Sequence, residues 1–126
     1  DALMAPTRIY VKPVLELLES GRIDGLAHIT GGGLTENITR ILPGGLSLSI
    51  DTTSWRRPAV FEWLRQNGGI TESEMLRTFN CGVGMVMLAE SGEVNHLIDA
   101  AAELGLDCFT IGEVTADTGT HSVEFL

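Results

Sequence analysis

Three consecutive glycines, Gly31 to Gly33, separate an apolar segment from an amphipathic one. Residues 26–30 predict a short strand, and the apolar residues between Leu34 and Leu42 recur at helical spacing until Pro43 stops them. Glycine accepts a positive φ and lets a ligand approach main-chain N–H groups closely. The run therefore predicts a strand–loop–helix unit.

On chemistry alone, two readings of this loop stay open. A glycine loop followed by a helix is suited to an anion, most often a phosphate. Loop glycines also form plain tight turns. The run is neither of the familiar nucleotide motifs, because no Gly-Lys-Ser/Thr follows and the spacing is not G-x-G-x-x-G.

A second run of interest, Asn80-Cys81-Gly82-Val83-Gly84, stands where a predicted helix ends and an apolar segment begins. The amide of Asn80 both donates and accepts hydrogen bonds, and the paired glycines suggest another close backbone approach. In the structural reading, Asn80 and Gly82 cap the helix and Cys81 packs as a small hydrophobic residue. The almost wholly apolar segment 83–89 predicts a central strand buried on both faces.

Turn and cap signals divide the rest of the chain into alternating strands and helices, which predict a single layered α/β or α+β domain over residues 1–126. The expected elements are an extended Arg8–Val11, a helix begun by Pro13 and ended by Gly21, a strand at 46–50, a helix capped within Asp51–Ser54, a helix begun by the capping box Thr71–Glu74, a helix at 94–102 ended by Gly105, and a last pair of strands, 108–114 and 122–126, around Asp117-Thr118-Gly119.

Charge and cysteine usage exclude several classes of protein. Eight Lys and Arg against 17 Asp and Glu give a net charge of −9, which argues against nucleic acid as a partner. No apolar stretch reaches the roughly 18 residues of a membrane span. Two cysteines without zinc-site spacing fit a reducing cytoplasm better than a secreted disulfide framework.

Three separated runs in the right order, Pro6–Lys12, His28–Asn37 and Phe79–Met85, closely resemble the C-terminal half of the aminoimidazole ribonucleotide synthetase family, the phosphoribosylformylglycinamidine cyclo-ligases. The resemblance runs from Pro6 to about Val114. It implies an α+β domain with an α/β/α layering and a mixed sheet, partly similar to ferredoxin-like folds.

The function implied by the resemblance is ATP-dependent closure of formylglycinamidine ribonucleotide to aminoimidazole ribonucleotide in purine biosynthesis, with Mg²⁺ accompanying the nucleotide. The chain then corresponds to the C-terminal, substrate-facing domain of a homodimeric enzyme roughly twice as long. The N-terminal domain of that enzyme carries most nucleotide contacts and the main dimer interface. We therefore expect the chain alone to be inactive.

The resemblance assigns roles to residues of the first glycine loop. It implies that the N–H groups of Gly31, Gly32 and Gly33 meet a substrate or nucleotide phosphate, with Thr30 adding a hydroxyl. Asn37 would hydrogen-bond the ligand. Glu36 either holds the loop or a metal-bound water, or only caps the helix. No direct metal ligand is expected.

Residues outside this loop complete the expected site. Asn80 and Gly82 are expected to contact substrate or its phosphate, while Arg8 reaches a phosphate and Tyr10 stacks on a base or ribose. His28 has the pKa range to accept a proton from the attacking nitrogen, and its alternative is a satisfied core histidine.

A hypothesis from another class remains alongside this one. The same layered fold and glycine loops suit a non-catalytic regulatory module that binds a phosphorylated metabolite.

Overall fold

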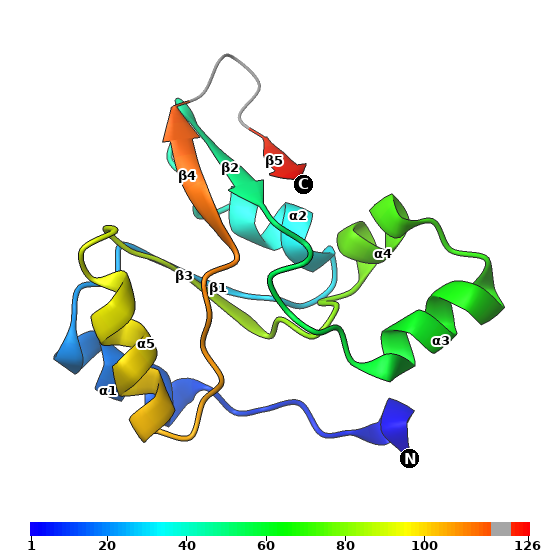
Figure 1. Cartoon of the computed structure of the whole chain (residues 1–126), viewed down its shortest axis with the longest axis horizontal. Helices are drawn as coiled ribbons and strands as arrows, with labels where there is room; N and C mark the ends of the chain where they lie inside the picture. The colour runs from blue at the N-terminus through cyan, green and yellow to red at the C-terminus, as the bar shows by residue number, and fades with distance from the viewer. Residues whose placement is uncertain (117–121) are drawn as a thin grey trace.

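The computed structural model describes residues 1–116 and 122–126 (Figure 1). The described residues form five α-helices and five strands. In chain order, after a short 3₁₀ turn at Ala2–Met4, they are α1 (Val11–Ser20), β1 (Gly25–His28), α2 (Gly33–Thr39), β2 (Leu46–Ile50), α3 (Ala59–Gly68), α4 (Glu72–Thr78), β3 (Met85–Leu88), α5 (Val94–Glu103), β4 (Gly112–Ala116) and β5 (Val123–Phe125).

The strands form two sheets. β1 and β3 make an antiparallel pair in which His28 lies opposite Met85. The second sheet has the order β4-β2-β5, with β2 antiparallel to β4 and parallel to β5. The α+β class and the mixed sheet predicted from the sequence are therefore confirmed, with the strands divided between two sheets.

The last two strands lie on opposite sides of β2, so they do not pair with each other. The expected turn Asp117-Thr118-Gly119 lies outside the described residues. β4 begins at Gly112, four residues later than expected. At Gly112 the chain comes so close to β2 that a Cβ atom would lie 2.0 Å from the carbonyl oxygen of Ser49.

β3 is not the central strand expected from its composition. Among the strands that the structure describes it is hydrogen-bonded only to β1, and of its four residues only Val86 is buried. An apolar run shows that a segment contacts apolar neighbours, but it does not specify how many strands pair with it. β3 pairs with β1 along one edge, and its remaining contacts are with side chains.

Two helix starts also differ from the sequence prediction. α1 begins at Val11 rather than at Pro13, so the expected extended segment Arg8–Val11 gives its last residue to the helix, and α3 begins after Pro58. The Asp51 carboxylate instead accepts hydrogen bonds from the N–H and hydroxyl of Thr53, which satisfies it within its own turn. A residue that precedes proline is disfavoured in the helical conformation, so α3 begins only after Pro58.

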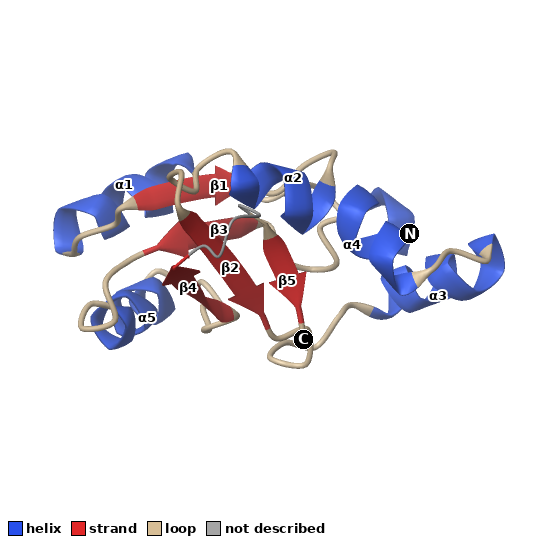
Figure 2. Ribbon diagram, turned by 90° about the horizontal axis from the view of Figure 1, so that it is seen from above, coloured by secondary structure: helices blue, strands red, loops and turns tan. Residues whose placement is uncertain are grey.

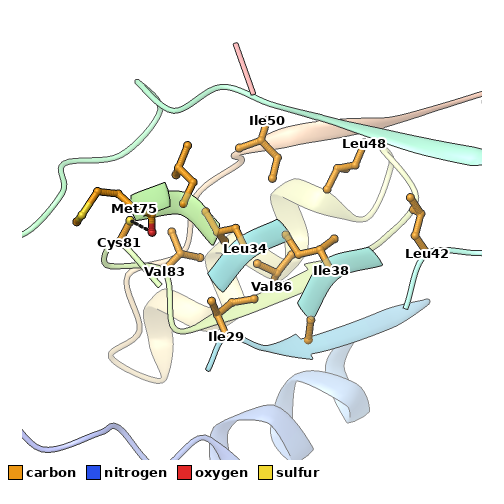
Figure 3. Close-up of a cluster of buried hydrophobic side chains, with 12 residues drawn as sticks. Ile29, Leu34, Ile38, Leu42, Leu48, Ile50, Met75, Cys81, Val83 and Val86 are labelled. Atoms are coloured by element: carbon orange, nitrogen blue, oxygen red, sulfur yellow. Dashed lines mark hydrogen bonds between the residues drawn. The ribbon is translucent and has the colours of Figure 1, made fainter. Parts of the chain in front are cut away.

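The core lies between the two sheets. α2 contacts β1 of one sheet and β5 of the other, and its Leu34 and Ile38 are fully buried. Figure 3 shows the side chains that surround them. These are Ile29, Leu42, Leu48, Ile50, Met75, Cys81, Val83 and Val86.

The helices at the two ends of the molecule differ in how they are covered. α1 and α5 pack side by side through buried Leu17 and Leu97 (Figure 1). α3 lies at the opposite end and has no fully buried residue (Figure 2). The expected cap of α4 is confirmed, because the Thr71 hydroxyl accepts a hydrogen bond from the N–H of Glu74.

Candidate functional site

The first glycine loop is held by main-chain contacts at both ends. The buried Ile29 donates its N–H to the carbonyl of Gly84 at 2.9 Å. Gly32 and Gly33 have φ values of +96° and +58°. A Cβ on Gly33 would also lie 2.2 Å from the carbonyl oxygen of Leu76, so this position requires glycine for both conformation and space.

Asn37 holds the first glycine loop in its shape through hydrogen bonds from its side chain. Its side chain is buried, and its amide nitrogen lies 2.8 Å from the carbonyl of Gly33 and 3.3 Å from those of Thr30 and Gly31. The amide nitrogen that was expected to meet ligand therefore donates to the loop itself. Any ligand contact of Asn37 stays a prediction.

The loop leaves two adjacent peptide donors free. Among the described residues, neither Gly31 nor Gly32 has an acceptor for its N–H, whereas the N–H of Gly33 donates to Thr30 at 3.1 Å. Thr30 and Gly31 are exposed, and a Cβ on Gly31 would meet no atom within 4 Å. The loop can therefore offer two adjacent N–H groups to an acceptor from solvent.

Glu36 is close to this opening. A Cβ built on Gly32 would lie 2.6 Å from a carboxylate oxygen of Glu36, and the same oxygen lies 3.8 Å from the guanidinium of Arg40. An anion at the loop would meet this negative charge, which Arg40 partly offsets. The loop is therefore suited to an anion that binds together with a cation.

The second glycine run is tightly built into the fold. The Asn80 carboxamide oxygen accepts a hydrogen bond from the N–H of Gly82 at 3.0 Å. Gly82 has φ +100°, and a Cβ there would lie 2.5 Å from Pro58. The Asn80 amide nitrogen has no acceptor within the part of the chain that the structure describes, so it is available to a ligand.

Cys81 packs in the core, as the structural reading predicts. It is fully buried at φ +50°, its thiol lies 3.5 Å from the carbonyl of Met75, and Trp55 donates its indole N–H to the Cys81 carbonyl. Burial raises the pKa of the Cys81 thiol. The protonated thiol is a poor nucleophile, so Cys81 has a structural role.

Tyr10 and His28 meet beside the two glycine runs. Their ring centroids are 5.7 Å apart with an interplanar angle of 65°, an edge-to-face contact. Both line an open hollow of about 460 Å³ together with Arg8, Val14 and Met85. The imidazole is exposed, so the alternative of a satisfied core histidine is wrong.

Residues 1–124 match the family model described as "AIR synthase related protein, C-terminal domain". The chain belongs to this family. Two curated relatives, from Burkholderia pseudomallei strains 1710b and K96243, are each named phosphoribosylformylglycinamidine cyclo-ligase. Each is 49% identical over 116 residues, which cover 92% of this chain and 33% of the relative. The chain thus spans about a third of their length, less than the half expected from the sequence.

In this AIR synthase related domain the structure brings the predicted site residues into two neighbouring groups. The two glycine runs abut, because Ile29 bonds to Gly84 and Gly33 lies against the Phe79 carbonyl. The second group is the Tyr10–His28 hollow, which includes Arg8. Sequence reasoning missed Gly84 as a contact of Tyr10, although its place in the Gly-Val-Gly run was a visible signal.

An ion pair that sequence reasoning also missed braces the second run of the AIR synthase related domain. Arg57, just before Pro58, donates two hydrogen bonds to the Glu72 carboxylate at the start of α4. These bonds lower the pKa of Glu72 and raise that of Arg57. The pair ties the segment that contacts Gly82 to α4.

Two kinds of feature are absent from the described residues of this AIR synthase related domain. No three His, Cys, Asp or Glu side chains among them are grouped closely enough to hold a metal ion. No helix in the same residues is long and apolar enough to cross a bilayer.

Proposed function

We propose that this chain is the substrate-facing domain of a phosphoribosylformylglycinamidine cyclo-ligase, which closes formylglycinamidine ribonucleotide to aminoimidazole ribonucleotide at the expense of ATP. The family match and the relatives' names support the reaction. The structural observation that carries the proposal is the pair of free N–H groups at Gly31 and Gly32, in a loop that has open space at the exposed Gly31. Such a pair is suited to a phosphate oxygen.

Each expected residue then has a defined task. Gly31 and Gly32 donate to the phosphate, and the exposed Thr30 hydroxyl adds a third donor. Gly33 and Asn37 hold the loop in its shape from within. Asn80 and Gly82 meet the substrate from the adjoining run, where the Asn80 amide nitrogen is the available donor.

We propose that His28 accepts the proton that is released when the ring closes. When nitrogen attacks the activated carbon, it becomes acidic and must lose a proton for the ring to close. The exposed His28 imidazole lies at the end of β1, where the glycine loop begins, and imidazole is the side chain that most often serves as a general base. We assign it the role of general base, with Arg8 facing the same hollow as a partner for substrate phosphate.

ATP and Mg²⁺ belong to this proposal through the whole enzyme. When bound, ATP supplies the phosphoryl group that turns the formyl oxygen into a leaving group. The described residues do not fit a Mg²⁺ site by themselves, because Mg²⁺ needs several convergent oxygen ligands and only the single carboxylate of Glu36 lies at the loop. An indirect contact of Glu36 through water fits better.

The preceding part of the protein completes the site in this proposal. Six of the nine large hydrophobic residues exposed among the described residues lie between Leu3 and Leu18. On α1, Val11, Leu15 and Leu18 are 68%, 57% and 44% exposed and share one helix face. We propose that the N-terminal domain covers this apolar stripe, and that the whole enzyme is a cytoplasmic homodimer.

A substitution at Gly31 tests the phosphate site. Gly31 has an ordinary φ and room for a side chain, so Gly31→Val adds bulk without backbone strain. In the full-length enzyme it should weaken binding of formylglycinamidine ribonucleotide by about 1–3 kcal/mol, the scale of lost charge-assisted hydrogen bonds, and the dephosphorylated analogue much less. Calorimetry with both ligands measures the difference.

Gly44→Val is the matched control, because a Cβ there also meets no atom within 4 Å. It should leave both affinities unchanged. Equal losses for both ligands in Gly31→Val would remove the phosphate from the loop. Binding without turnover in the unmodified full-length protein would favour the non-catalytic module.

A further inference from the structure

Tyr10 is packed against the domain, whereas the residues before and after it in the sequence are exposed. Ile9 and Val11 are exposed, at 82% and 68%, while Tyr10 is half-buried. Its carbonyl accepts the N–H of Val14 at 2.9 Å, and Tyr10 is the N-cap residue of α1. Because α1 packs on α5 through Leu17, the backbone of Tyr10 is anchored to the body of the domain.

The ring of Tyr10 lies directly over Gly84. A Cβ atom on Gly84 would lie 2.0 Å from the Tyr10 hydroxyl oxygen and 3.0 Å from the ring carbon that carries it. Gly84 does not have a positive φ, so its backbone would accept alanine. What requires glycine here is therefore the space taken by the Tyr10 side chain, first by its hydroxyl oxygen and then by the adjoining ring carbons.

The same ring contacts His28 edge to face, at 5.7 Å between centroids. Gly84 and His28 are kept together by the strand pairing, since Met85 lies opposite His28 and the Gly84 carbonyl accepts the N–H of Ile29. Within the described residues, the His28 imidazole has no hydrogen bond or ion pair. Its orientation therefore depends on the Tyr10 ring.

We propose that Tyr10 is a positioning residue for His28. Its ring sets the orientation of the imidazole, and Gly84 leaves the space that the ring needs. This inference rests on the proposed role of His28 in ring closure. Stacking of Tyr10 on a base or ribose stays a separate prediction.

Kinetics of the full-length enzyme test the proposal. Tyr10→Leu removes the ring, and Gly84→Ala displaces it without altering Tyr10. Both should lower kcat about fivefold with little change in KM, which corresponds to an edge-to-face contact of about 1 kcal/mol. Tyr10→Phe keeps the ring and should retain normal kcat. Gly44→Ala, whose Cβ meets nothing within 4 Å, is the matched control for the added methyl group.

A double-mutant cycle separates positioning from a general structural effect. In a His28→Ala background, Tyr10→Leu should cause no further loss of kcat. A further fivefold loss there would overturn the proposal. So would a Tyr10→Phe enzyme as slow as Tyr10→Leu, because the hydroxyl rather than the ring would then be the active group.

A spectroscopic measurement keeps this inference distinguishable from the proposed function. The ring-carbon proton resonances of His28 should shift in Tyr10→Leu and Gly84→Ala and stay in place in Tyr10→Phe and Gly44→Ala. Unchanged resonances in Tyr10→Leu would overturn the positioning role. If those resonances shift but His28→Ala retains normal kcat, the role of His28 in ring closure fails, and with it the effect of Tyr10 on catalysis.

Discussion

A single buried amide decides whether the first glycine loop keeps its shape. Asn37 donates toward three carbonyl oxygens that all point at its amide nitrogen, with the closest, that of Gly33, at 2.8 Å. Three converging carbonyls without a donor would repel one another and leave buried acceptors unsatisfied. Asn37 therefore supports the loop, whatever ligand the loop takes.

Asn37→Asp replaces this donor with a carboxylate of nearly the same shape. The charged form would face three carbonyl oxygens, so we expect a loss of stability of about 3 kcal/mol at neutral pH, the scale of a buried charged group without a partner. Urea denaturation measures it. Asn67→Asp is the control, because the exposed Asn67 amide also donates to a carbonyl, that of Trp63, and should cost less than about 1 kcal/mol. Equal losses would contradict the role given to Asn37.

At the scale of elements, the site depends on how closely α2 approaches α4. The first residue of α2, Gly33, lies against the carbonyls of Leu76 and Phe79 at the end of α4. These two helices are joined to the two glycine runs. Their close approach therefore holds the Gly31–Gly32 donors beside Asn80.

Gly33→Ala tests this approach, with Gly69→Ala as a matched control. Both residues have φ near +60°, but a Cβ would lie 2.2 Å from a carbonyl oxygen at Gly33 and would meet nothing within 4 Å at Gly69. Gly69→Ala should cost about 1 kcal/mol from backbone strain alone. Gly33→Ala should cost at least about 2 kcal/mol more, because two main-chain segments must separate. Chemical denaturation of both variants decides it, and equal losses would show that the contact is loose.

At the scale of the whole molecule, the described residues leave one helix face without a partner. The apolar stripe Val11, Leu15 and Leu18 lies on an exposed face of α1, apart from the buried Leu17. Exposed apolar residues are ordinary when single, whereas a contiguous stripe indicates a contact surface. The chain covers only 33% of its relatives' length, so most of such a protein is available to cover it.

Leu15→Glu in the full-length enzyme tests whether this stripe is covered. If the N-terminal domain packs on it, the variant should lose about 2–3 kcal/mol of stability in urea denaturation, because an apolar contact is lost and a charge is buried. Val114→Glu is the control. It replaces another exposed apolar residue, on the edge strand β4, and should cost no more than about 1 kcal/mol. A Leu15→Glu protein as stable as this control would leave the stripe uncovered.

The sequence by itself determined the features that depend on neighbours along the chain. The glycine loop after β1, the Thr71 cap of α4, the glycine ends of α1 and α3 and the alternating strand β2 follow from local backbone preferences and from apolar periodicity. The family resemblance rests on the same local runs. The sequence therefore identified candidate site residues, but not their positions relative to one another.

Only the tertiary structure decided which segments meet. The division of five strands between two sheets, the free edge of β3 and the packing of Tyr10 between His28 and Gly84 all join residues far apart in the sequence. Periodicity reports that a side chain is buried, while the identity of its partner depends on how every element packs at once. For that reason the sequence did not indicate that Tyr10 and Gly84 are in contact, although both stood in runs that it singled out.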